Sequence, residues 1–342
     1  MKYARLGNTG LIVSRLSLGT MTFGSDPSMP NIYKVSSEDA RAMVETALGA
    51  GVNFFDTANG YSKGESETML GELLGARRRD VVLATKVGFR SGDAVTEAGL
   101  SRRHILEACD ASLKRLNTDY VDLYIVHKED PFTPLEETLE ALDSLVRAGK
   151  VRYLGFSNWA AWKAAAALEM QKAKGWAKFT SGQMYYSLVG RDVEHDVVPF
   201  LLHSGLTMNV WSPLAGGFLS GKYRRENLND DDNRLSGFDF LPTDKELGFR
   251  VVERMREAAS ARGASVAQVA LAWLLSKPFV SSIIVGATKL HQLEDNLKAA
   301  EVELSGEELS ELDAMTAPAP LYPHWFNNNL VDARHKEILG GS

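Results

Sequence analysis

Short apolar runs rich in β-branched residues alternate with amphipathic segments along the chain, and this alternation occurs eight times. Such runs are typical of strands, and several are apolar throughout, as strands must be when both faces of a sheet are covered. The predicted strands are RLSLGT (15–20), VNFFDT (52–57), VVLATKV (81–87), VDLYIVH (121–127), VRYLGFS (151–157), FTSGQM (179–184), LTMNVWS (206–212) and SSIIVGA (281–287).

The segments between these runs have helical spacing. In PLEETLEALDSLVRAGK, Pro134 suits a first helical turn, and Leu135, Leu139, Leu142 and Val146 recur along one face. The other predicted helices cover 36–51, 65–75, 101–116, 159–174, 193–204, two stretches within 245–277, and 290–300, with GEELSEL (306–312) as a short addition.

Strand–helix units in series require right-handed crossovers and a parallel sheet. Eight such units in 342 residues favour a closed barrel over an open doubly wound sheet. An open sheet that binds a dinucleotide would carry G-x-G-x-x-G after its first strand, whereas this strand continues into LGTMTFGS. We therefore expect an α/β fold in which residues 1–342 form a single (β/α)8 TIM barrel domain. An N-terminal extension, a long loop after strand 7 and a C-terminal tail would be added to it.

Composition excludes several classes of protein. With 44% hydrophobic residues the chain can bury a large core, and its net charge of −6, with acidic and basic residues interleaved, is unlike a nucleic-acid-binding surface. The single cysteine, Cys109, allows no internal disulfide and fits a reducing cytosol. The start MKYARLGNTGLIVS lacks the apolar core of a signal peptide, and no later segment approaches the ~20 apolar residues of a membrane span. These features indicate a cytoplasmic protein with no membrane or nucleic-acid partner.

Polar and ionisable residues stand at the carboxyl ends of the predicted strands, where active sites of TIM barrels lie. Each has an ordinary explanation by itself, such as a turn for Asp56 or a structural role for His127, but their joint occurrence on one ring indicates a site. The residues at these strand ends, polar and apolar together, are Gly19, Thr20, Met21, Asp56, Lys86, His127, Ser157, Asn158, Gln183, Trp211, Ser212, Gly286 and Ala287.

Sequence patterns typical of other functional classes are incomplete in this chain. GGFLSGKY (216–223) begins like a P-loop, but Tyr223 stands where a P-loop needs Ser or Thr; what remains is a glycine-rich loop suited to a dinucleotide pyrophosphate. The acidic run NDDDN (229–233) lacks EF-hand spacing, and the histidines other than His127 lack metal-ligand spacing, so no metal site is predicted. Tyr61 and Lys86 are too far apart for the Tyr-x-x-x-Lys pair of short-chain dehydrogenases.

Seven motifs, in one order and covering nearly the whole chain, resemble the aldo-keto reductase family. They resemble especially the branch that contains bacterial aldo/keto reductases and potassium channel β subunits. The motifs are RLGNTGLIVSRLSLGTMTFG, DTANGYSKGESETMLGELL, ATKVG, SLKRLNTDYVDLYIVH, VRYLGFSNW, WSPLAGGFLSGKY and VGATKLHQLEDNL. The resemblance implies that Asp56, Tyr61, Lys86 and His127 form a catalytic tetrad. It also implies reduction of aldehyde or ketone carbonyls to alcohols, and the reverse, with NADPH.

The chemistry accounts for that set of side chains. Hydride transfer from a nicotinamide to a carbonyl builds negative charge on the oxygen, which needs a proton or a preorganised donor. Tyr61 would be the donor, and the base in the reverse reaction. A free phenol has a pKa near ~10, which an adjacent ammonium such as Lys86 should lower. Asp56 would keep Lys86 charged, and His127 would hydrogen-bond the carbonyl oxygen.

The resemblance also implies contacts with the cofactor. Ser157, Asn158 and Gln183 would bind the nicotinamide carboxamide and Trp211 would stack on the ring; the alternatives are a helix cap for Ser157–Asn158 and a core position for Trp211. Thr288, Lys289 and Gln292 would bind the 2′-phosphate end, with Asp295 and Asn296 at the adenine. Thr288 could instead cap a helix. The remaining predicted cofactor contacts are Gly19, Thr20, Met21, Asp56, Ser212, Pro213, Leu214, Gly216, Lys222 and Gly286.

Cofactor preference follows from Gln292, which stands where some relatives have arginine. A weaker phosphate clamp predicts that NADPH is preferred while NADH is used to some extent. A different class of function stays open beside the enzyme, namely a cofactor-binding regulatory subunit with weak redox activity, because an intact tetrad fits both.

The substrate pocket is predicted to contain Phe23, Tyr61, His127, Trp159, Tyr186 and Trp325. Trp325 belongs to the tail APAPLYPHWFNNNLVDARHKEILGGS (317–342), which is unusually aromatic for a terminus. The tail has two interpretations. It is either a strap along the outside of the barrel, stiffened by its prolines, or a segment that returns to the catalytic face, where Tyr322, Trp325 and Phe326 wall the pocket.

Overall fold

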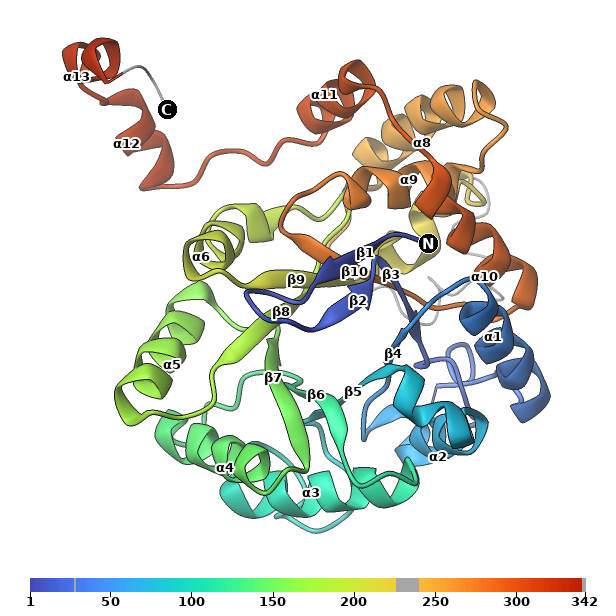
Figure 1. Ribbon diagram of the computed structural model, residues 1–342. Coiled ribbons are helices and arrows are strands. Elements are labelled where there is room, and N and C mark those ends of the chain that lie inside the picture. Colours follow the sequence, from blue (N-terminus) through green and yellow to red (C-terminus); the bar gives the residue numbers. More distant parts are fainter. Residues whose placement is uncertain (28, 226–239, 340–342) are drawn as a thin grey trace.

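The computed structural model describes residues 1–27, 29–225 and 240–339, so the acidic run at 229–233 lies outside the described residues. Eight parallel strands close into a barrel in the order β10-β3-β4-β5-β6-β7-β8-β9, with helices around it (Figure 1). The strands are β3 (Leu16–Gly19), β4 (Phe54–Asp56), β5 (Val82–Val87), β6 (Val121–Val126), β7 (Val151–Ser157), β8 (Phe179–Tyr185), β9 (Thr207–Trp211) and β10 (Val280–Val285). The predicted (β/α)8 barrel is confirmed.

Helices follow the strands as predicted. They are α1 (Ser37–Gly49), α2 (Glu65–Leu74), α3 (Arg102–Arg115), α4 (Leu135–Arg147), α5 (Ala161–Lys174), α6 (Val197–Ser204), α8 (Lys245–Ser260), α9 (Val266–Leu275), α10 (Leu290–Leu297) and α11 (Gly306–Met315). Their ends have local causes: Ser265 and Gln268 form a capping box at α9, and Ser305 and Glu308 form another at α11. Among the described residues, no helix is both long enough and apolar enough to cross a membrane.

The N-terminal extension is a hairpin of β1 (Tyr3–Arg5) and β2 (Ile12–Ser14), which the sequence analysis did not predict as strands. It contributes Leu6 and Val13 to the cluster inside the barrel. Gly7 has φ +58°, and a Cβ there would lie 2.2 Å from the carbonyl oxygen of Thr180 at the start of β8. The hairpin therefore closes the amino ends of the strands and leaves the carboxyl ends for a site.

Alternation along the strands decides which side chains face the barrel interior. Phe54 belongs to the interior cluster, whereas Phe55 belongs to the core between strands and helices. Because successive side chains of a strand point to opposite faces, Asp56 points inward above Phe54. Lys86 likewise follows the inward-facing Val82 and Ala84 of β5.

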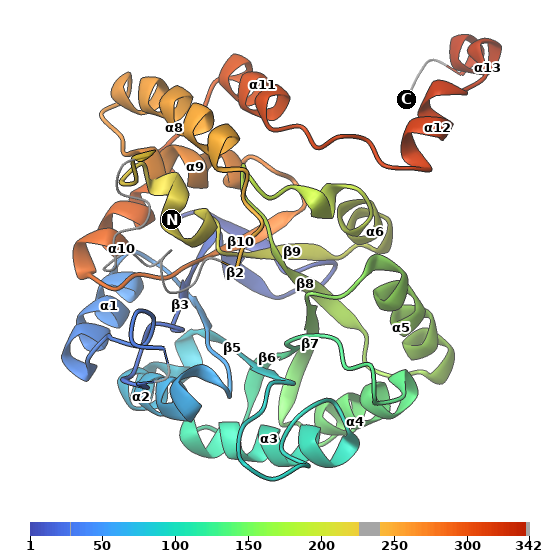
Figure 2. The same ribbon diagram turned by 180° about the vertical axis from the view of Figure 1, so that it is seen from behind.

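The C-terminal tail stands away from the barrel. Its helices α12 (His324–Asn329) and α13 (Ala333–Ile338) lie apart from the body in both views (Figures 1 and 2). Every residue from 321 to 339 is exposed except the half-buried His324. Both interpretations of the tail were therefore wrong for a single copy, because it neither straps the outside of its own barrel nor walls its own pocket.

Candidate active site

An ammonium group links three of the predicted catalytic positions. Lys86 Nζ donates to Asp56 Oδ1 at 2.5 Å, to the carbonyl oxygen of Thr57 at 2.8 Å and to Tyr61 Oη at 3.1 Å. Lys86 is fully buried and Asp56 is 2% exposed. A buried charge requires partners of this kind, because desolvation without them costs several kcal/mol. The three donated bonds use the full donor capacity of the ammonium.

Tyr61 is held over Lys86 by an unusual turn. It begins the 3-10 turn η1 (Tyr61–Gly64), in which Ser62 and Lys63 have φ of 46° and 52°. Non-glycine residues adopt this conformation rarely, and it costs energy that other contacts must offset. Ser62 Oγ donates to Glu65 Oε2 at 2.9 Å, and the same carboxylate oxygen accepts from the Ser25 amide at 2.9 Å.

His127 follows β6 and completes the group. Its ring packs edge-on against Tyr61, with centroids 5.9 Å apart, and against Phe89 at 4.5 Å. Burial lowers the pKa of His127 well below its ordinary range, and the nearby Lys86 and Lys128 lower it further. The imidazole is therefore neutral at physiological pH, so it can orient a ligand by hydrogen bonding but is not the acid of the site.

The pKa of Tyr61 differs in direction from the sequence prediction. Burial raises it and outweighs the lowering effect of Lys86, while Asp56 adds to the increase. The expectation that Lys86 would lower the phenol toward neutrality was wrong as a net effect. For Lys86, burial lowers the pKa, but Asp56 and Tyr61 raise it to a net increase. At neutral pH the site thus holds a protonated phenol beside a charged ammonium.

The predicted carboxamide contacts join this centre. Gln183 Nε2 donates to Asp56 Oδ2 at 2.8 Å, and Ser157 Oγ donates to the carbonyl oxygen of Gln183 at 2.8 Å. Asp56 therefore bridges Lys86 on one side and Gln183 across the barrel on the other.

Asn158 extends the same network to Trp211. Its Nδ2 donates to Ser157 Oγ at 2.9 Å and to the carbonyl oxygen of His127 at 3.0 Å. Its Oδ1 accepts from Trp211 Nε1 at 3.0 Å. With φ at +58°, Asn158 turns the chain at the end of β7, so that its amide reaches His127 at the end of the neighbouring β6 and Trp211 at the end of β9. The structure thus brings Ser157, Asn158, Gln183 and Trp211 to one rim.

The residues around this rim include the positions that could hold a dinucleotide. Between β3 and β10, a Cβ on Gly19 would lie 2.5 Å from Ile284 Cγ2, and Gly286 lies opposite the carbonyl oxygen of Gly19. After β9, positive φ occurs at Ser212, Ala215, Gly216, Gly217 and Gly221. Several N–H groups of this loop already donate within it: those of Ala215 and Gly217 donate to the carbonyl oxygens of Ser212 and Leu214, and that of Gly216 donates to Ser212 Oγ.

A lysine lies beside that loop. Lys222 Nζ lies 3.7 Å from the position a Cβ would take on Gly217. The predicted contacts Ser212, Pro213, Leu214, Gly216 and Lys222 all belong to this segment, which includes η4 (Ala215–Ser220). The contact of this segment with a cofactor pyrophosphate stays a prediction.

The predicted adenosine end lies at the start of α10. The Thr288 amide and hydroxyl both donate to Gln292 Oε1, at 3.1 and 3.3 Å, and Lys289 is exposed next to them. Asp295 accepts from Ser265 Oγ at 2.6 Å and from Gln268 Nε2 at 2.7 Å, which ties α10 to α9. Asn296 is buried beside it.

Among the predicted groups of site residues, the substrate pocket differs most from the structure. Phe23, Trp159 and Tyr186 are at most 2% exposed and pack in the core between strands and helices. Trp325 lies on the projecting tail. Of the six predicted residues, Tyr61 and His127 alone lie at the catalytic centre. The positions of Phe23, Trp159, Tyr186 and Trp325 therefore differ from the predicted pocket.

Three aromatic residues at the site were missed. Tyr185 and Phe240 pack on Trp211, with ring centroids 5.3 and 6.3 Å away, and Phe89 packs on His127. A signal for Tyr185 was present: with Gln183 facing inward, alternation places Tyr185 inward and Tyr186 outward.

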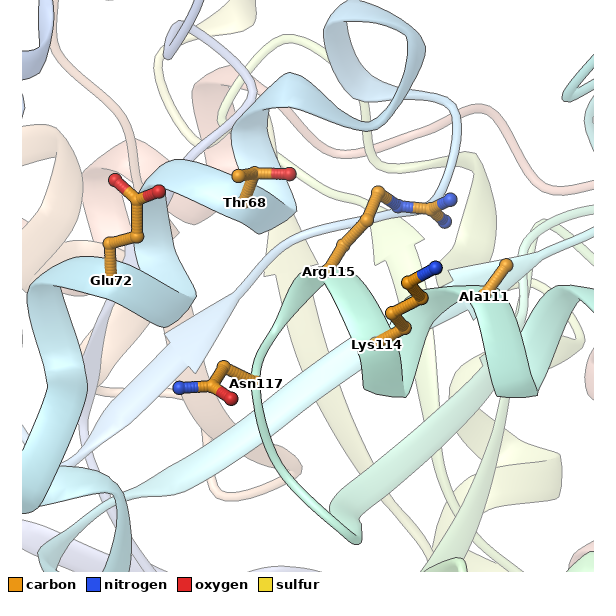
Figure 3. A pocket seen from close by; sticks show the side chains of 6 residues that line it. All are labelled: Thr68, Glu72, Ala111, Lys114, Arg115 and Asn117. Atoms are coloured by element: carbon orange, nitrogen blue, oxygen red, sulfur yellow. The ribbon is translucent and has the colours of Figure 1, made fainter.

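A cleft of about 560 Å³ lies elsewhere, between α2 and α3 on the outside of the barrel. Five of its six lining residues are of polar or charged types, Glu72 and Lys114 among those shown in Figure 3. Arg115, also in the lining, is paired with Glu67 at 2.7 Å. The cleft does not include the tetrad. Within the described ranges, no cluster of three or more His, Cys, Asp or Glu side chains is arranged to hold a metal ion.

Comparison with known proteins agrees with the geometry. The model of the aldo/keto reductase family matches residues 15–317. Versiconal hemiacetal acetate reductase of Aspergillus parasiticus is 35% identical, over 94% of this chain and 99% of its own. A probable voltage-gated potassium channel subunit beta of Oryza sativa subsp. japonica is 37% identical over 94% and 98%, and an uncharacterized oxidoreductase of Bacillus subtilis is 38% identical over 92% and 95%. The chain belongs to the aldo/keto reductase family of oxidoreductases.

Proposed function

We propose that the protein is an NADPH-dependent reductase of aldehyde or ketone carbonyls, with Tyr61 as the proton donor. The hydrogen bond between Lys86 Nζ and Tyr61 Oη, 3.1 Å long and inside the Asp56–Lys86 pair, is the observation that carries this proposal. It couples a phenol that is protonated at neutral pH to a fixed positive charge. That combination can give up a proton and stabilise the phenolate that remains.

The nicotinamide, when bound, supplies the hydride. Tyr61 Oη donates its proton to the substrate oxygen as negative charge builds there, and Lys86 stabilises the resulting phenolate. Asp56 holds the ammonium charged and oriented, and its second oxygen fixes Gln183. A neutral His127 orients the carbonyl without competing as an acid. Alcohol oxidation uses the same groups in reverse, with Tyr61 as the base.

The proposal is tested by following NADPH oxidation with a panel of aldehydes, ketones and keto-sugars. Steady turnover of at least one class supports it. The second candidate is a cofactor-binding regulatory subunit with weak redox activity, favoured by relatives named as potassium channel β subunits at 36–37% identity. Tight NADPH binding without turnover of any substrate would favour that candidate instead.

The pH dependence follows from the two pKa directions. Carbonyl reduction needs the Tyr61 phenol, and its pKa lies above the ordinary ~10. His127 stays neutral because its pKa is well below ~6.5. We expect kcat for reduction to be flat between about pH 6.5 and 9 and to fall only as pH rises through the Tyr61 pKa. The kcat for oxidation of the matching alcohol, in which Tyr61 is the base, should increase as the pH rises toward the Tyr61 pKa. A tenfold loss of reduction per pH unit below pH 9 would contradict this assignment.

Cofactor preference is expected to depend on Gln292. NADPH should be used with higher kcat/KM than NADH, which should still support some turnover. Gln292→Arg should lower the KM for NADPH by roughly 5- to 10-fold, because an arginine binds phosphate with two parallel charge-assisted hydrogen bonds. NADH, which lacks the 2′-phosphate, is the internal control and should change little. Equal or better efficiency of the wild type with NADH would refute the preference.

A further inference from the structure

Residues 317–339, here called the C-terminal arm, expose an unusual amount of apolar surface. The arm extends from α11 past α6, and its two helices project outward beyond the contact that His324, the first residue of α12, makes with the body (Figures 1 and 2). Its large apolar side chains are 45% to 78% exposed. They are Leu321, Tyr322, Trp325, Phe326, Leu330, Val331, Ile338 and Leu339.

The composition of the arm is that of a protein interface. Residues 317–331 contain no Asp, Glu, Lys or Arg but include three aromatic residues. Interface cores are depleted in charge and enriched in aromatic side chains. Trp325 and Phe326 are 45% exposed and Tyr322 is 73% exposed, so burial of these rings and their aliphatic neighbours in two arms removes apolar surface from water on the scale of a protein interface, which is roughly 1,600 Å² in total. Monomeric proteins rarely leave apolar patches of this size exposed.

Two large apolar side chains are exposed at the catalytic end of the barrel. Phe132, in the loop after β6, is 93% exposed, and Trp162, at the start of α5, is 71% exposed. Glu129 joins the two segments, because it accepts from the Ala160 amide at 2.8 Å and from Lys163 Nζ at 3.3 Å. We call Phe132 and Trp162 the apolar rim.

The root of the arm lies at the same end. His324 Nε2 is 3.2 Å from Asp196 Oδ1, just before α6, and the His324 ring stacks on His195. Pro318 and Pro320 favour an extended linker before this point. From its root the arm runs outward rather than toward its own α5 (Figure 2).

We propose that two copies of the chain exchange arms, so that the arm of each copy, with Trp325 at its centre, docks on the apolar rim of the other. Root and rim lie on neighbouring parts of one end of the barrel, beside α6 and α5. A twofold axis next to this edge therefore brings each arm to the other copy's rim. The arrangement is isologous and closes at two copies. This inference is independent of the proposed reaction, and its test does not use activity.

Sedimentation velocity at micromolar concentration should show a dimer for the full chain. Deletion of residues 318–342 should give a monomer. Trp325→Ala with Phe326→Ala should raise the dimer dissociation constant about 30-fold or more, the scale expected for central aromatic hot spots. Ile12→Ala is the control, because Ile12 is also an exposed apolar residue, 56% exposed, but lies on the hairpin at the opposite end. A full-length monomer would overturn the proposal, and so would a dimer that survives the deletion.

Cross-linking tests the place of docking. Cys109 is buried, and burial raises the pKa of its thiol to about 12, so the native chain gives little background. A mixture of the Asn328→Cys and Ala160→Cys variants, treated with a short bismaleimide, should form a covalent dimer that neither variant forms as readily alone. A dimer without this cross-link would overturn the assignment of the rim. Binding of a monomeric chain to vesicles of phosphatidylcholine and phosphatidylglycerol would assign the arm to lipid instead and overturn the proposal.

Discussion

Tyr61→Phe is expected to lower turnover in carbonyl reduction by roughly 10²-fold or more, the contribution typical of a lost general acid. The substitution removes the hydroxyl that accepts from Lys86 Nζ at 3.1 Å and leaves the ring against His127. Lys86 keeps its bonds to Asp56 and Thr57, so the buried ammonium remains paired. The measurement is steady-state kcat with the best substrate of the panel, together with the NADPH dissociation constant from fluorescence.

Two comparisons make this result specific. The NADPH dissociation constant should stay within about twofold, because an interaction made with the reacting oxygen does not contribute to cofactor binding. Tyr120→Phe is the matched control; Tyr120 lies between the guanidinium groups of Arg78 and Arg152, before β6, and should leave kcat unchanged. Near wild-type turnover of Tyr61→Phe would show that another group donates the proton.

The barrel could be predicted because its strands are encoded locally. Runs such as VVLATKV and VDLYIVH are apolar on both faces, and their carboxyl ends mark one ring of positions. Asp56, Lys86 and Gln183 are each the last but one residue of a predicted strand, and the structure joins them through carboxylate oxygens of Asp56. Tyr61 lies off this ring in a strained turn, so its place depended on the family resemblance rather than on strand periodicity.

Quantities that depend on burial could not be predicted. The presence of Lys86 near Tyr61 suggests a lower phenol pKa, but the balance between that charge and desolvation depends on how much protein surrounds both groups. The net increase in the pKa of Tyr61 is therefore a property of the fold. With its pKa above the ordinary value, the Tyr61 phenol is protonated at neutral pH.

The two chain ends were poorly predicted for different reasons. The hairpin strands β1 and β2 have three residues each, and tertiary contacts such as Gly7 against Thr180 hold them in place. The arm is aromatic enough for burial, yet its own barrel offers no burial beyond the root at His324 among the described contacts. The sequence of such a segment indicates that its aromatic side chains favour burial, but it does not indicate which surface buries them.

Tyr186→Ala is expected to destabilise the protein by about 3–5 kcal/mol, the range for truncation of a large core aromatic. Tyr186 is fully buried, with its ring centroid 5.4 Å from that of Trp273 and 5.6 Å from that of Phe279. Its hydroxyl donates to Glu194 Oε1, which Arg191 also binds. The measurement is the free energy of unfolding from urea titration, with KM determined at a temperature where the variant is folded.

A neighbouring pair of tyrosines separates a core role from a pocket role. Tyr186→Phe keeps the ring and removes only the hydrogen bond to Glu194, so it should cost about 1.5–3 kcal/mol, as expected for a bond to a charged group. Tyr185→Ala changes the ring that packs on Trp211, and it should alter KM more than stability. If Tyr186→Ala instead left the free energy of unfolding unchanged and shifted KM several-fold, Tyr186 would be a pocket residue after all. Tyr185 ends β8 and Tyr186 follows it on the opposite face, which predicts that Tyr186→Ala lowers stability rather than shifts KM.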